Sequence, residues 1–200
     1  AKVFPEFMIA TTVDQFPYEK ARNMIVDACL KADVTHLLFL DSDMFPPADI
    51  AKDLYEAMVE SKSQVTTGFT YRRGGEYRSV WYSQHEGKAV EVYVNDSVPE
   101  PIEIRACGMA CTLIDLEWAN KNLEKPFFVF DRTPGNELGE DINYCRQVRK
   151  AGGRVFGIPK VRVPHLSDRI AIMDSNVHVF RQFDANDIPK SGKSLTSKGE

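Results

Sequence analysis

An uninterrupted apolar run, Thr35 to Leu40 (THLLFL), leads directly into Asp41-Ser42-Asp43. Apolarity without alternation is typical of a central parallel strand that is covered on both faces. Two carboxylates that leave such a strand at positions i and i+2 are held at the sheet edge, where their repulsion is costly without a cation. We therefore expect a divalent metal site at the end of a buried strand. The alternative is a turn in which Asp41 acts as a cap and Asp43 is solvated.

Strand-like and helix-like segments alternate around this run. In chain order they are a strand at Phe7 to Thr11, a helix from Ala21, the strand at Thr35 to Leu40, a helix at Ala48 to Val59 and a strand at Gln64 to Thr70. This alternation predicts an α/β fold with a Rossmann-like mixed, mostly parallel sheet flanked by helices. Ligands of such sheets bind beyond the carboxyl ends of the strands.

The second half of the chain changes character and then returns to apolar segments. Residues 71 to 106, with Gly74-Gly75 and alternating stretches, predict an antiparallel insertion. The expected later elements are a strand at Met109 to Ile114, a helix at Leu116 to Asn122, a helix at Glu140 to Ala151 ended by Gly152-Gly153, and a strand at Val155 to Ile158 before Pro159. Residues 1–183 are interpreted as a single catalytic domain and residues 184–200 as a polar tail.

Composition excludes several classes of protein. The 200 residues carry 43% hydrophobic residues and a formal net charge of -4, which does not indicate nucleic-acid binding. No apolar run is long enough to span a bilayer. The four cysteines have no CxxC spacing, so we expect buried thiols and a reducing, cytoplasmic location. The chain begins at Ala1, which fits a piece of a larger protein.

Three further features carry candidate chemistry. Arg22 lies in an Ala-Arg-Asn segment ahead of the apolar run, Glu140 and Asp141 open a helix, and His165 follows the last expected strand. An arginine near an acidic edge can pair with phosphate, and a carboxylate can deprotonate a hydroxyl. Taken singly, they also fit a surface helix charge, a pair of helix caps and a structural histidine.

In this order, the segments resemble a GT-A glycosyltransferase, the DxD-containing, nucleotide-sugar-dependent class that includes family 2. The resemblance spans residues 21–166 and includes a Gly-containing apolar strand, Cys107-Gly108-Met109-Ala110. It implies transfer of a sugar from a UDP- or GDP-sugar donor to a hydroxyl of a glycan, protein or small-molecule acceptor. It also implies a Mn²⁺ or Mg²⁺ cofactor.

The resemblance assigns roles to individual residues. Asp41 and Asp43 would hold the metal that bridges the donor diphosphate, with Asp43 as the main anchor and Asp41 turned toward the ribose or sugar. His165 would be a further metal ligand. In the same way, Arg22 would touch the nucleotide and Gly108 would let the backbone approach the donor sugar.

The remaining residues that the resemblance assigns lie on the acceptor side and at the N-terminus. Asp141, with Glu140 as the alternate, would act at the acceptor and the anomeric carbon. Family members usually carry more strands before the Ala-Arg-Asn segment, whereas only residues 1–20 precede it here. Either the fold is abbreviated, or Phe7 to Thr11 forms a nucleotide-contacting strand that ends at Thr11.

Two other functions remain open from the sequence. Haloacid-dehalogenase-like phosphatases also place a DxD motif after an apolar strand, but Phe45 stands where their pattern requires Thr or Val. A module that binds a sugar nucleotide or glycan without turnover is the second alternative. Donor hydrolysis in the presence of Mn²⁺ would distinguish an enzyme from such a module.

Overall fold

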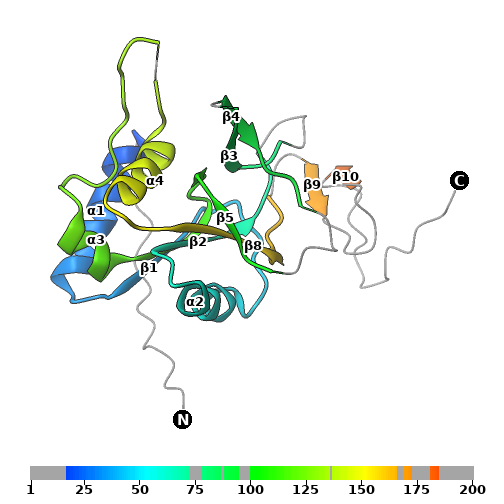
Figure 1. The fold of residues 1–200 in the computed structure, drawn as a ribbon. Coiled ribbons are helices and arrows are strands. Elements are labelled where there is room, and N and C mark those ends of the chain that lie inside the picture. The colour runs from blue at the N-terminus through cyan, green and yellow to red at the C-terminus, as the bar shows by residue number, and fades with distance from the viewer. Residues whose placement is uncertain are drawn as a thin grey trace, which may run out of the picture.

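Helices and strands alternate between residues 18 and 69, as expected (Figure 1). The computed structural model describes residues 17–72, 78–86, 88–94, 100–135 and 137–165, and the backbone of strands at 169–172 and 181–184. The helices are α1 (Tyr18–Lys31), α2 (Ile50–Ser61), α3 (Leu116–Asn122) and α4 (Glu140–Lys150). The strands are β1 (His36–Leu40), β2 (Val65–Phe69), β3 (Trp81–His85), β4 (Lys88–Glu91), β5 (Ile102–Ile104), β6 (Ala106–Cys107), β7 (Cys111–Asp115), β8 (Val155–Arg162), β9 (Arg169–Ile172) and β10 (Arg181–Asp184).

The main sheet is mixed, with the strand order β1-β7-β2-β8-β5. Strands β2 and β8 pair in parallel, whereas β7 pairs antiparallel with both β1 and β2, and β5 pairs antiparallel with β8. The expectation of a mostly parallel sheet is therefore wrong for three of these four pairings. Strands β1 and β2 do share a direction, but β7 lies between them. A strand buried on both faces is apolar throughout whichever way it runs, so its sequence does not reveal its direction.

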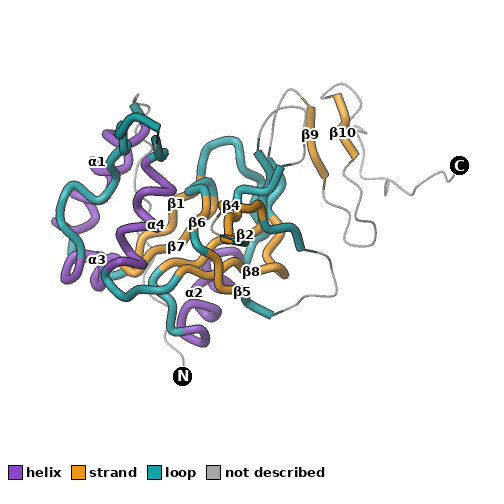
Figure 2. The backbone as a smooth tube through the Cα atoms, turned by 45° about the horizontal axis from the view of Figure 1, so that its top comes forward, coloured by secondary structure: helices purple, strands orange, loops and turns teal. Residues whose placement is uncertain are grey.

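Helices cover both faces of this sheet, which gives two apolar layers (Figures 1 and 2). Helix α2 packs on one face through Ile50, Leu54, Ala57 and Met58. On the other face, α1, α3 and α4 supply the buried residues Val26, Cys29, Leu116, Ala119, Tyr144, Cys145 and Val148. The four cysteines are free and buried, as predicted.

The insertion forms a second, antiparallel sheet with the order β4-β3-β6, which confirms that expectation. Trp81 of β3 joins it to the main sheet, because its fully buried indole donates from Nε1 to the carbonyl of Gly68 at 3.2 Å. A Cβ on Gly157 of β8 would lie 2.6 Å from the Trp81 ring, so only glycine permits this approach. The small sheet is thereby fixed beside the carboxyl end of β2.

Several element boundaries differ from the sequence-based expectation. Residues Gly108 to Ala110 connect β6 to β7, so Cys107 to Ala110 do not form one strand and the strand expected from Met109 begins only at Cys111. Strand β5 was not expected. Strand β8 continues through Pro159 to Arg162. Proline is tolerated because the β2–β8 register shifts there, from Gly68 opposite Ile158 to Phe69 opposite Arg162, so no ladder hydrogen bond is needed.

Other boundaries are confirmed or stay untested. Helix α3 has the expected bounds, and Gly152, with φ +85°, follows α4 at its expected end. The expected strand at Phe7 to Thr11 lies outside the described residues, as does the expected tail at 184–200 apart from Asp184, which ends β10.

Candidate functional site

The Asp41-Ser42-Asp43 segment forms a turn at the carboxyl end of β1. The backbone N–H of Met44 donates to the carbonyl of Asp41 at 3.1 Å, which closes the turn. Met44 is also bridged to His165, the residue that follows β8 by a short connection. Because Met44 is buried, this bridge anchors the turn to the core and brings His165 beside the carboxylate of Asp43.

His165 faces Asp43, and a contact on the other side of its ring fixes the orientation of the imidazole. Its Nε2 lies 3.1 Å from Oδ2 of Asp43, and its Nδ1 lies 2.9 Å from the carbonyl oxygen of Tyr71. A carbonyl only accepts, so Nδ1 carries the hydrogen and Nε2 is the atom turned toward the carboxylate. Both side chains are largely shielded, with 16% and 23% exposure. The close contact of Nε2 with a carboxylate is favourable when a proton or a cation is shared between them.

The Asp43–His165 pair fits part of a metal coordination sphere. Two ligands that each lie about 2.1 Å from one ion are roughly 3 Å apart, close to the observed separation. A ligating histidine also typically donates its other ring nitrogen to a backbone carbonyl, as His165 does to Tyr71. Within the described part of the chain, no group of three or more His, Cys, Asp or Glu side chains is arranged to hold a metal ion. Asp41, the third expected ligand, has a different partner.

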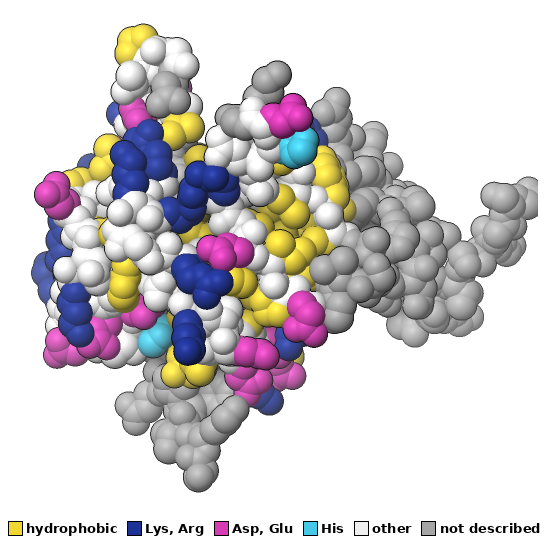
Figure 3. Space-filling view, viewed as in Figure 1, with side chains coloured by type: hydrophobic (Ala, Val, Ile, Leu, Met, Phe, Trp, Pro, Cys, Tyr) yellow, Lys and Arg dark blue, Asp and Glu magenta, His cyan; other side chains and the backbone are white. Residues whose placement is uncertain are grey.

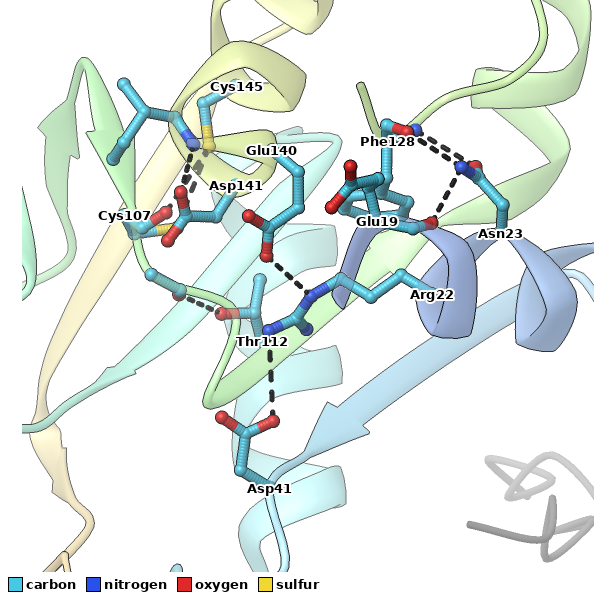
Figure 4. A network of polar contacts seen from close by, with 12 residues as sticks. Glu19, Arg22, Asn23, Asp41, Cys107, Thr112, Phe128, Glu140, Asp141 and Cys145 are labelled. Atoms are coloured by element: carbon cyan, nitrogen blue, oxygen red, sulfur yellow. Dashed lines mark hydrogen bonds and ion pairs between the residues drawn. The ribbon is translucent and has the colours of Figure 1, made fainter. Parts of the chain in front are cut away.

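Arg22 from α1 lies between Asp41 and Glu140 (Figure 4). Its Nε donates to Oε1 of Glu140 at 3.1 Å, while its Nη2 lies 3.9 Å from Oδ1 of Asp41. The guanidinium carbon is also 5.3 Å from the ring centre of Phe39. The side chains of Arg22 and Glu140 are only 12% and 11% exposed, so this is no surface helix charge. The expected contact of Arg22 with a nucleotide stays a prediction.

Asn23, the neighbour of Arg22, ties α1 to the segment before the 131–138 loop. Its side-chain amide donates from Nδ2 to the carbonyl of Phe128 at 2.7 Å, and its Oδ1 accepts from the N–H of Phe128 at 3.0 Å. Phe128 in turn stacks on Tyr144 of α4 at 4.6 Å. The Asn23 amide therefore pairs with the backbone of Phe128 as a neighbouring strand would. It fixes the aromatic ring of Phe128, which lies beside Arg22.

Asp141 lies in the first turn of α4, close to Gly139 and Gly108. Its Oδ1 accepts from the N–H of Ile142 at 2.7 Å. Burial raises the pKa of the Asp141 carboxyl, and the neighbouring Glu140 raises it further. A Cβ on Gly139 would lie 2.7 Å from Oδ1, and one on Gly108 would lie 3.8 Å from Oδ2. A Cβ at position 139 would therefore crowd this carboxylate, whereas one at position 108 would make only an ordinary contact with it.

Four of the expected site elements thus converge at one edge of the sheet. The structure brings Asp43 to His165, Arg22 to both Asp41 and Glu140, and Gly108 to Asp141. Thr11 lies outside the described residues. Sequence reasoning missed the backbone carbonyl of Tyr71, which has no sequence signal, and the clamp made by Asn23. It also missed Thr112, whose hydroxyl lies 2.9 Å from the carbonyl of Gly108.

Comparison with known proteins supports the fold at a distance. A scan against protein-family models gives no match, and a search of curated proteins finds no significant match. The crystal structure of A197 from STIV matches with a TM-score of 0.59 and 20% identity, over 85% of this chain and 78% of that one. GalNAc-T7 with UDP, GalNAc and Mn²⁺ matches with a TM-score of 0.51 and 16% identity, over 75% of this chain and 30% of that one. The likeness to GalNAc-T7 indicates a distant GT-A-like fold.

The charges on the surface and the apolarity of the helices are relevant to nucleic-acid and membrane partners. Figure 3 shows Lys and Arg side chains spread over the helix-bearing side of one face, with Asp and Glu among them. Mixed signs of this kind do not favour a polyanion on that face. Among the described residues, no helix combines the length and apolarity needed to cross a membrane.

Proposed function

We propose that the chain is a metal-dependent glycosyltransferase that moves a sugar from a nucleotide-diphosphate sugar to an acceptor hydroxyl. The observation that carries the proposal is the Asp43–His165 pair, with Nε2 and Oδ2 at 3.1 Å. It lies beyond the carboxyl ends of β1 and β8, which run in the same direction, and α/β folds bind ligands at such strand ends. The distant likeness to GalNAc-T7, a structure that contains UDP, GalNAc and Mn²⁺, supports the same class of chemistry.

The residues of the chain divide into a donor side and an acceptor side. On the donor side, Asp43 and His165 would hold Mn²⁺ or Mg²⁺, with Asp41 as a further oxygen ligand. A divalent ion held there would supply the positive charge that a leaving diphosphate needs. Gly108 is the donor-side residue at which the backbone would approach the sugar of a UDP- or GDP-sugar.

On the acceptor side, Asp141 is the general base. Its pKa is raised by burial, which makes the carboxylate a stronger proton acceptor for a hydroxyl of a glycan, protein or small molecule. Glu140 cannot serve in the same way while its carboxylate is paired with Arg22 at 3.1 Å. Of the two carboxylates, Asp141 is therefore the better candidate. Its role in an inverting reaction is proton abstraction, and in a retaining one it is to position the acceptor.

The test is a thermal-shift screen of UDP- and GDP-sugars with and without Mn²⁺. A donor at 100 times its dissociation constant adds about 2.7 kcal/mol to the free energy of unfolding, which shifts the melting temperature measurably. Asp43→Asn should remove the Mn²⁺-dependent part of the shift. Asp49→Asn is the matched control, because Asp49 is an exposed aspartate whose side chain makes no capping hydrogen bond to α2.

Turnover separates an enzyme from a binding module. Release of free sugar from the stabilising donor, measured with Mn²⁺ present, supports the transferase. Stabilisation without hydrolysis or transfer in any acceptor mixture would favour the non-catalytic module. A full Mn²⁺-dependent shift in the Asp43→Asn protein would contradict the proposed metal site.

A further inference from the structure

We propose that Arg22 is a positioning residue that competes with the divalent cation for the carboxylate of Asp41. The inference rests on the proposed function, because it requires a cation at the Asp43–His165 pair. It changes the role expected for Arg22, from a nucleotide contact to a residue that acts through a metal ligand.

The guanidinium of Arg22 is fixed by the protein itself. Its Nε is hydrogen-bonded to the buried Glu140 at 3.1 Å, and it packs beside the rings of Phe39 and Phe128, at 5.3 and 6.0 Å. Only 12% of the side chain is exposed. The planar guanidinium therefore holds one orientation before any ligand binds, and this orientation is set by α4 and by the rings of Phe39 and Phe128.

Asp41 is the movable partner. Its Oδ1 lies 3.9 Å from Nη2 of Arg22, at the outer limit of an ion pair, and 46% of its side chain is exposed. Its backbone is nevertheless anchored, because its N–H donates to the carbonyl of Ala110 at 2.9 Å. A weak, half-exposed ion pair costs little to break, so rotation of the side chain can carry the carboxylate toward Asp43.

The two positions of Asp41 have opposite consequences for the cation. While Asp41 faces Arg22, the Asp43–His165 pair lacks its third protein ligand. When the cation recruits Asp41, Arg22 keeps only Glu140. Removal of the Arg22 charge should therefore tighten cation binding. An arginine that contacts the nucleotide behaves differently, because its loss weakens nucleotide binding and leaves the affinity for the cation alone unchanged.

The experiment is a titration of the nucleotide-free protein with Mn²⁺, in which electron paramagnetic resonance measures the free ion. Arg22→Met should lower the dissociation constant about twofold to fivefold, the range for release of an exposed ion pair. The gain should shrink as salt is added. In an Asp41→Asn background, Arg22→Met should change nothing, which distinguishes competition for Asp41 from a general effect of removing a positive charge.

A second variant and a control keep the test decisive. Arg22→Lys retains a positive partner for the buried Glu140 if the Met variant fails to fold, and a single ammonium cannot span both carboxylates, so tightening is still expected. Arg154→Met removes an arginine that also pairs with a carboxylate, Glu103, and packs on an aromatic ring, but at the amino end of β8. It should leave the affinity for Mn²⁺ unchanged.

The outcomes separate this inference from the function beneath it. Binding of Mn²⁺ that depends on Asp43 but is indifferent to Arg22, or weaker without it, overturns the inference alone. A wild-type protein that binds no Mn²⁺ overturns the metal site and the inference together.

Discussion

The Nε2 atom of His165 lies 3.1 Å from Oδ2 of Asp43, although the two residues are far apart in the sequence. The Met44–His165 bridge and the Tyr71 carbonyl fix this contact from both sides. An imidazole held in one tautomer against a carboxylate is prepared to share a cation with it. The pair therefore predicts how the choice of metal depends on His165.

We expect His165→Ala to reduce Mn²⁺-supported donor binding more than Mg²⁺-supported binding. Mg²⁺ strongly prefers oxygen ligands, so it depends less on an imidazole. Calorimetric titration of UDP or GDP with each metal measures the two losses. His85→Ala, which removes an exposed histidine on β3, should alter neither. Equal small losses with both metals would make His165 a structural residue.

Asp141→Asn should lower turnover and raise stability at neutral pH. General bases contribute about a hundredfold or more to rate, so sugar transfer should fall by at least that factor while donor affinity is kept. The pKa of Asp141 is raised chiefly by burial, which means that the folded state favours the protonated carboxyl. The stabilising effect of this group on the folded state is therefore complete when the carboxyl is protonated. That effect is lost as the pH rises through the raised pKa, and the charge then costs stability.

Urea denaturation at several pH values measures the stability difference for Asp141→Asn. The advantage of the variant over the wild type should be present at neutral pH and disappear in acid, where the wild-type carboxyl is protonated in the folded and unfolded states. Transfer at the wild-type rate would show that Asp141 is not the general base and has only a structural role at the start of α4. Glu140→Gln is the companion variant, and it tests the pairing with Arg22 instead of the base.

Gly108→Ala should fold normally but impair donor use. A Cβ at this position would lie 3.4 Å from Cβ of Val80, an ordinary contact, so stability should change by about 1 kcal/mol or less. The added methyl group would lie where the donor sugar is proposed to approach the backbone, which should raise the donor KM. Gly157→Ala is the contrast, because its Cβ would meet Trp81 at 2.6 Å and should cost about 1 to 3 kcal/mol. An unchanged KM in Gly108→Ala would remove Gly108 from the site.

Asn23→Ala should destabilise the protein by about 1 to 3 kcal/mol, since it leaves the N–H and carbonyl of Phe128 without their partner. Asn23→Asp keeps the acceptor for the Phe128 N–H but loses the donor to its carbonyl. Thermal denaturation should therefore place the Ala variant below the wild type and report a loss for the Asp variant as well. Wild-type stability in both would show that this clamp contributes nothing measurable.

Local patterns in the sequence predicted the elements but not their neighbours. The apolar spacing in α1, α2 and α4 predicted helices because a helix must bury one stripe, and the run before Asp41 predicted β1 because a covered strand is apolar on both faces. The short strand β5 went unnoticed because three residues carry no clear period. The position of β7 between β1 and β2 was missed because pairing direction depends on connections far along the chain.

The sequence by itself determined which residues can carry chemistry, because the carboxylate, imidazole and guanidinium groups belong to the side chains themselves. It also determined that the residues after an apolar strand lie at an edge of the sheet. Tertiary structure decided how those groups are shared: Asp43 faces His165, while Asp41 and Glu140 face Arg22. The reason is that α1, β1, α4 and the segment after β8 meet only when the sheet is packed. Partners chosen across such distances depend on the whole core, and no local period in the sequence records them.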